Sequence, residues 1–127
     1  MKEVTKMIPF PPYDYRIYVT FAGDLTAAAD KLAKKGKLSK DHEVDDTTAG
    51  FCVNVPNQGE SYVVLKFNAN INQVSHESYH ALCGLFRWIG AKHEEELFAY
   101  HLGYLIDMIE QDRKDLTLKE LSSILGV

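Results

Sequence analysis

Two histidines and a glutamate stand close together in the segment His76-Glu77-Ser78-Tyr79-His80. Residues four apart on a helix lie one turn above each other, so His76 and His80 can both direct a ring nitrogen at one ion. Glu77 is turned by about 100° from His76 and can take a proton from a metal-bound water instead of binding the metal. We therefore predict Zn²⁺ as cofactor, His76 and His80 as ligands and Glu77 as general base. The alternative is an ordinary amphipathic helix that carries two surface histidines.

A catalytic zinc site usually has three protein ligands and keeps one position for water. We expect the third ligand to be Glu96, because Ala99 and Gly103 follow it at spacings that let its helix lie close to the first. If the first helix runs unbroken from His80 to residue 89, however, it rises about 14 Å beyond the site. Glu96 then reaches the metal only if that helix breaks near Gly84 or if the two helices cross steeply.

Other side chains near these positions have weaker chemical interpretations. His101 is the alternative third ligand, and Cys83 shares the helical face of the two motif histidines. Tyr100 and Tyr104 follow Glu96 by one and two turns, where a phenol can support an oxyanion. For each of these four residues packing is the competing interpretation.

The segments His-Glu-Ser-Tyr-His-Ala at 76–81 and Glu-Leu-Phe-Ala-Tyr-His-Leu-Gly-Tyr at 96–104 resemble short HExxH proteins of bacteriophages and prophages. By that resemblance the chain is a minimal zincin-like metallopeptidase with a glutamate third ligand, a gluzincin. The resemblance covers about half of the chain, and the stretch between the two segments is shorter than this family leads us to expect. It implies His76, His80 and Glu96 as metal ligands and Glu77 as general base, and it implies no particular substrate.

Composition narrows the class of protein. The chain has 127 residues, 46% of them hydrophobic and 25% charged, which predicts one globular domain over residues 1–127. No apolar run approaches the roughly 18 residues of a membrane span, so we expect no membrane partner. The net charge of −4 argues against nucleic acid as the main partner. Cys52 and Cys83 have no CxxC spacing, which favours two reduced thiols in a cytoplasmic protein.

Five lysines follow one another closely, and we interpret them as a solvated face near a helix C-terminus, where the helix dipole favours positive charge. DNA binding is the alternative. The five are Lys31, Lys34, Lys35, Lys37 and Lys40.

The helices and strands that must position the motif are predicted from prolines, strand-forming residues and helix-capping residues. The three prolines before residue 13 indicate an extended arm over residues 1–13 that lies on the surface. We predict a strand at 15–21, a helix at 24–35 capped by Asp24, and a hairpin of strands 50–55 and 61–67. Helices follow at 72–89 and 93–112, and a last one begins at Thr117 with Glu120 in a capping box. We place Leu97, Tyr100, Tyr104 and Met108 on one stripe of the helix at 93–112.

This order predicts an α+β, zincin-like domain with a small mixed or antiparallel sheet. The sheet would pack on the HExxH helix and on a second helix that bears the third ligand. The leading hypothesis is a zinc-dependent peptidase, with an extended protein or peptide substrate added to the edge of the sheet along a hairpin strand. The alternative is a phage-encoded, non-catalytic binding module on the same scaffold, in which the metal is structural or absent.

Overall fold

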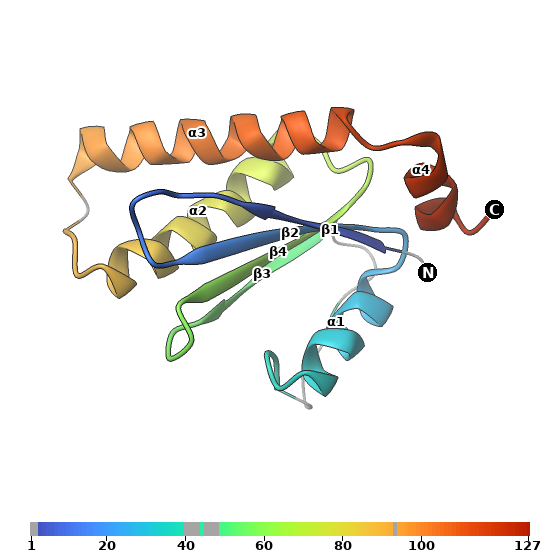
Figure 1. Ribbon diagram of the computed structural model, residues 1–127, viewed down its shortest axis with the longest axis horizontal. Coiled ribbons are helices and arrows are strands. Elements are labelled where there is room, and N and C mark those ends of the chain that lie inside the picture. The colour runs from blue at the N-terminus through green and yellow to red at the C-terminus, as the bar shows by residue number, and fades with distance from the viewer. Residues whose placement is uncertain (1–2, 40–43, 45–48, 93) are drawn as a thin grey trace.

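The computed structural model describes residues 3–39, 44, 49–92 and 94–127, and within them four β-strands form one mixed sheet between two helical layers (Figure 1). Helices α2 and α3 cover one face of this sheet, and α1 lies on the other face. The elements in chain order are β1 (Glu3–Ile8), β2 (Arg16–Ala22), α1 (Leu25–Lys34), β3 (Gly50–Val55), β4 (Glu60–Lys66), α2 (Ile71–Trp88), α3 (Glu95–Lys114) and α4 (Leu118–Leu125). The expected α+β class is confirmed, whereas a zincin-like relationship stays a prediction.

The sheet has the strand order β1-β2-β4-β3. The β3–β4 and β1–β2 pairs are antiparallel, and β2 runs parallel to β4, with α1 and β3 between them in the chain. Side chains alternate between the two faces: Ile17, Val19 and Phe21 face the main core under α2 and α3. Val64 faces the smaller core under α1. The sheet therefore holds α2 on one side and leaves β3 as an edge strand.

The N-terminal segment differs from the expected surface arm. Residues Glu3–Ile8 form edge strand β1, which pairs antiparallel with β2 along its whole length. Val4 and Ile8 are 7% and 1% exposed and belong to the main core. The first proline comes only at Pro9, so every residue of β1 has the N–H that a strand ladder needs.

Helix ends are fixed by the capping residues that the sequence indicates. Asp24 accepts a hydrogen bond from the backbone N–H of Ala27 at the start of α1. Thr117 and Glu120 form a reciprocal capping box at the start of α4. These two predictions are confirmed, and the hairpin of β3 and β4 is confirmed as well.

The predicted apolar stripe of α3 is wrong by one position. The buried residues of this helix are Phe98, Leu105 and Ile109, whereas Tyr100 is 74% exposed and Tyr104 is 40% exposed. Leu97, Tyr104 and Met108 each directly precede one of the buried residues, and one residue along a helix is a rotation of about 100°. The phenol groups thus keep access to water while the purely apolar side chains enter the core.

The turn of the β3–β4 hairpin packs against the end of α2. Gly59 has a φ of +65°, and a Cβ atom there would lie 2.9 Å from the Trp88 ring. Glycine is therefore required both by the backbone conformation and by the close approach of the indole. The Trp88 ring also lies 6.2 Å from the ring of Tyr15.

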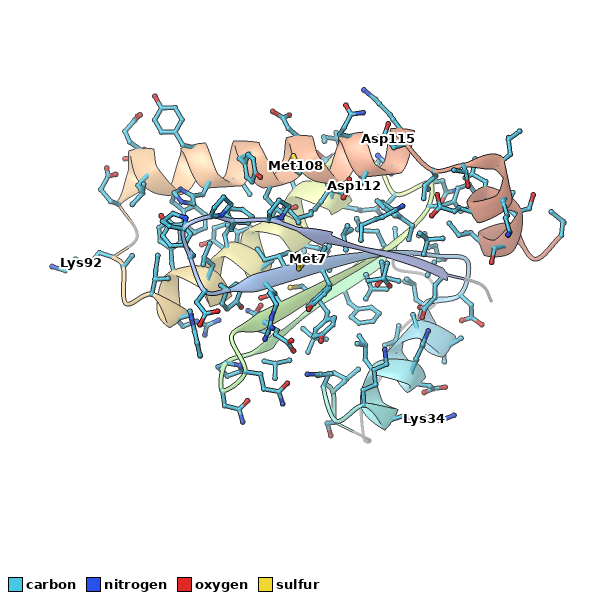
Figure 2. The ribbon with its side chains drawn as sticks, in the orientation of Figure 1. Met7, Lys34, Lys92, Met108, Asp112 and Asp115 are labelled. Atoms are coloured by element: carbon cyan, nitrogen blue, oxygen red, sulfur yellow. The ribbon has the colours of Figure 1, made fainter. Side chains whose placement is uncertain are left out.

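The lysines of the predicted basic face do not act as one group, because two of them form ion pairs with different glutamates. Lys31 pairs with Glu3 at 2.7 Å, and Lys37 pairs with the buried Glu60 at 2.7 Å. Lys34 extends away from the protein (Figure 2), and Lys40 lies outside the described residues. Among the described residues, no helix has the length and apolar character needed to cross a membrane.

Candidate metal centre

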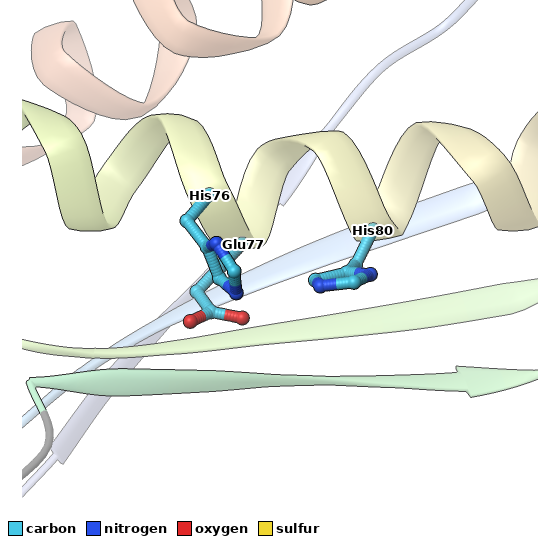
Figure 3. Close-up of side chains that lie close together, drawn as sticks. All are labelled: His76, Glu77 and His80. Carbon is cyan, nitrogen blue, oxygen red and sulfur yellow. The ribbon is translucent and has the colours of Figure 1, made fainter.

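His76, Glu77 and His80 converge on the side of α2 that faces the hairpin strands (Figure 3). One ligand atom from each of the three side chains can be chosen such that all lie within 4.8 Å of one another. The two imidazole rings have centroids 4.8 Å apart and are nearly perpendicular, with an interplanar angle of 76°. Both histidines are exposed, and Glu77 is half-buried beside them. The donor set of two imidazoles and one carboxylate suits Zn²⁺.

The start of α2 explains why the three side chains share this position. Asn70 and Gln73 form a reciprocal capping box that fixes the first turn, a feature the sequence analysis missed although both residue types are common there. Val74 and Ala81 on the opposite face are fully buried in the main core. Anchoring one face of the helix in the core leaves the histidines pointing out of it.

An open groove of about 710 Å³ lies between the first half of α2 and the edge strand β3. The three side chains of the HExxH motif line one wall together with Asn72 and Gln73. The other wall is formed by β3 and the residue before it: Ala49, Gly50, Phe51, Cys52 and Asn54. The motif therefore borders a surface groove and is not enclosed in the core.

Gly50, the first residue of β3, lines the groove and packs closely against β4. A Cβ atom at this position would lie 2.7 Å from the carbonyl oxygen of Val64 and 3.6 Å from Cγ of Glu77. The first of these distances is too short for any side chain, so glycine is required here by the backbone of β4, whereas the distance to Glu77 is an ordinary van der Waals contact.

The electrostatics of the groove concern Glu77 and Cys52. Burial raises the pKa of Glu77, and the adjacent His76 and His80 lower it in part. Burial, followed by the charge of Glu77 and that of Cys83, raises the pKa of the Cys52 thiol. Cys52 is therefore a protonated thiol at neutral pH, and Glu77 has a higher proton affinity than an exposed carboxylate.

Glu96 does not join the group of side chains that could hold a metal ion. Within the described residues that group consists of the three motif residues alone. Helix α2 runs unbroken through Gly84 to Trp88, so α3 begins only after the last turns of α2 have passed the motif. Glu96 is exposed in the first turn of α3, where its backbone N–H donates to the carboxylate of the N-cap residue Glu94. The expectation that Glu96 is the third ligand is therefore not met.

The other candidate residues on α3 lie in a second hollow. Tyr100, His101 and Tyr104 line it together with three residues of the 10–13 segment. The Tyr104 hydroxyl donates to the carbonyl oxygen of Pro9 at 2.8 Å. His101 is bonded through Nδ1 to the Leu97 carbonyl and through Nε2 to the Tyr13 hydroxyl. The structure thus does not bring the predicted oxyanion support or the alternative ligand to the motif.

The two cysteines are free thiols. Cys83 is half-buried and packs against the main core, which agrees with its interpretation as a core residue. Cys52 lines the groove, and the sequence analysis assigned it no role at the site.

Comparison of the chain with known protein families, with curated proteins and with solved structures gives no match.

Proposed function

We propose that this chain is a zinc-dependent hydrolase of the peptidase type. The observation that carries the proposal is the convergence of His76, Glu77 and His80 at the wall of an open groove. His76 and His80 would hold the metal, and their exposure leaves room for water and substrate beside it. Zinc, when bound, polarises a carbonyl group and lowers the pKa of water.

Glu77 is the general base in this mechanism. Its carboxylate accepts a proton from the attacking water and passes it to the leaving amine. Partial burial supports this role, because it raises the proton affinity of Glu77 above that of an exposed carboxylate. The carboxylate and the two imidazoles lie at the same wall of the groove.

The edge strand β3 supports an extended peptide as the substrate class. Within the described residues β3 pairs with β4 alone, and its other edge borders the groove. A peptide that adds to this edge receives main-chain hydrogen bonds from β3, and its scissile bond can then lie against the motif.

The first test is elemental analysis of bound metal. We expect about one zinc per wild-type chain, as for a single site with these ligands. His76→Ala and His80→Ala should lose this zinc, and Glu96→Ala should keep it, because Glu96 is not part of the group. Wild-type protein that takes up no zinc when it is offered would overturn the proposal and favour the non-catalytic binding module.

The second test separates a general base from a ligand. Glu77→Gln should keep its zinc and lose about 10²- to 10⁴-fold of the rate of peptide hydrolysis. Glu96→Gln is the matched control and should retain both metal and rate. A Glu77→Gln protein as active as wild type would rule out this mechanism, and loss of its zinc would make Glu77 a ligand.

A further inference from the structure

A chain of polar side chains crosses the interface between the sheet and α2. The Tyr15 hydroxyl is hydrogen-bonded to the Ser61 hydroxyl. Ser61 Oγ donates to Asn54 Oδ1 at 2.5 Å, and Asn54 Nδ2 donates to the backbone carbonyl oxygen of His80 at 2.9 Å. Tyr15 is 4% exposed and Ser61 is fully buried. Strands β3 and β4 and the residue before β2 are thereby connected to one backbone atom of the HExxH motif.

The chemistry of the partners fixes the direction of every bond in this chain. The His80 carbonyl only accepts, so the Asn54 amide must present Nδ2 to it and Oδ1 to Ser61. Ser61 has a single hydroxyl hydrogen, which it gives to Asn54, so it must accept from Tyr15. Burial raises the pKa of Tyr15, which keeps its hydroxyl protonated as the donor. Each donor in the chain thus fixes the orientation of the next.

Gly84 opens the path by which this chain reaches α2. A Cβ atom at position 84 would lie 2.5 Å from the Tyr15 hydroxyl oxygen and 2.7 Å from Asn54 Oδ1. Any other residue would therefore push both groups away from the helix. The missing side chain lets the Asn54 amide reach the carbonyl of His80 one turn earlier.

We propose that Asn54, oriented by Ser61 and Tyr15, is a positioning residue for His80. It fixes the backbone of His80 relative to β3, so the imidazole keeps its place beside His76 at the wall of the groove. Metal ligands need this support, because a site functions only when its side chains are held within about 0.5 Å of the productive geometry. The proposal rests on the proposed function as far as the metal is concerned.

Two variants break the chain at different points. Asn54→Asp keeps the size of the side chain but replaces the donor to His80 with an oxygen that cannot donate. Ser61→Ala removes the hydroxyl that orients Asn54 and adds no charge, so it serves if Asn54→Asp does not fold. Val63→Ala is the matched control, because Val63 is fully buried on the same strand as Ser61 and its apolar side chain donates no hydrogen bond.

The first readout is metal affinity and geometry. We expect zinc to bind about 10- to 100-fold more weakly to Asn54→Asp and to Ser61→Ala than to wild type. This is the usual effect of losing a partner that orients a metal ligand. The visible spectrum of bound Co²⁺ should change in the same variants. Val63→Ala should lose stability while its zinc affinity and Co²⁺ spectrum stay those of wild type, which separates positioning from a general loss of stability.

The second readout needs no metal and distinguishes this proposal from the proposed function. With ring centroids 4.8 Å apart, the imidazoles of His76 and His80 should show a nuclear Overhauser effect in the metal-free protein. Asn54→Asp and Ser61→Ala should weaken it, and Val63→Ala should not. Wild type without zinc affinity would refute the proposed function alone. If Asn54→Asp and Ser61→Ala both keep the wild-type nuclear Overhauser effect and the wild-type zinc affinity, the positioning role is overturned.

Discussion

The carboxylate of Glu77 is half-buried at the groove between α2 and β3, and burial raises its pKa. In the metal-free protein this is a cost, because the folded state holds a charge that the unfolded chain exposes to water. The same shift raises the proton affinity of Glu77, as the proposed role of general base requires. A residue that lowers stability where it raises reactivity is typical of a functional site.

We therefore predict that Glu77→Gln increases the free energy of unfolding of the metal-free protein at pH 7.5. The folded pKa of Glu77 lies above the unfolded one, so the wild-type protein loses stability relative to the variant as pH rises through this interval. The difference should vanish below about pH 4, where the carboxyl group is protonated in both states. Urea unfolding in the presence of a chelator measures it.

Asp107→Asn is the control for this comparison, because Asp107 is exposed on α3. Its stability should stay within about 0.5 kcal/mol of wild type at both pH values. A Glu77→Gln protein that is less stable than wild type at pH 7.5 would contradict the assigned direction of the pKa shift.

Helix α2 is the element that carries the site, and its place depends on how closely it packs on the sheet. Two helical glycines differ in this respect. Gly84 of α2 lies against Tyr15 and Asn54, whereas a Cβ atom at Gly103 of α3 would have no neighbour within 4 Å among the described residues. The same residue type is thus a packing requirement in one helix and a helix-weakening residue in the other.

Alanine at these two positions should have opposite effects on stability. Gly84→Ala should lower the free energy of unfolding by about 1–3 kcal/mol, because the added methyl group overpacks the interface. Gly103→Ala should raise it by about 0.5–1 kcal/mol, because alanine loses less backbone entropy in a helix. Urea denaturation of both variants tests the pair. Equal effects of the same sign would contradict the packing assigned to α2.

At the scale of the whole molecule, β1 belongs to the core architecture. Ile8 is 1% exposed in the main core, and its neighbour Met7 on the same strand is 54% exposed on the other face of the sheet. Ile8→Ala should lower the free energy of unfolding by about 2–4 kcal/mol. Met7→Ala should change it by about 0.5 kcal/mol or less. Comparable changes in the free energy of unfolding for the two variants would contradict the assignment of β1 to the core and favour a surface arm.

Local signals predicted much of this fold. An aromatic and β-branched run predicted β2, two strand-like segments joined by turn residues predicted β3 and β4, and the caps at Asp24 and Thr117 predicted where helices begin. The HExxH spacing predicted the convergence of two histidines, because four residues make one turn of any helix.

Features that depend on tertiary packing could not be predicted in the same way. The prolines of the N-terminal segment concealed strand β1, whose burial depends on the sheet beside it. The buried face of α3 differs from the predicted stripe by a rotation of about 100°, which corresponds to one residue along the helix. Asn54 was missed because its partner is a backbone carbonyl 26 residues later in the chain. Glu96 was misplaced because the continuity of α2 through a glycine is decided by its packing on the sheet.

The contact between Gly59 and Trp88 gives the molecule an optical reporter of its own. Trp88 is the sole tryptophan of the chain, and its ring is 42% exposed where it covers the hairpin turn. Indole fluorescence shifts to longer wavelengths when water reaches the ring. A single emission band, recorded without any attached dye, therefore shows when the hairpin that forms one wall of the groove separates from the helix that forms the other.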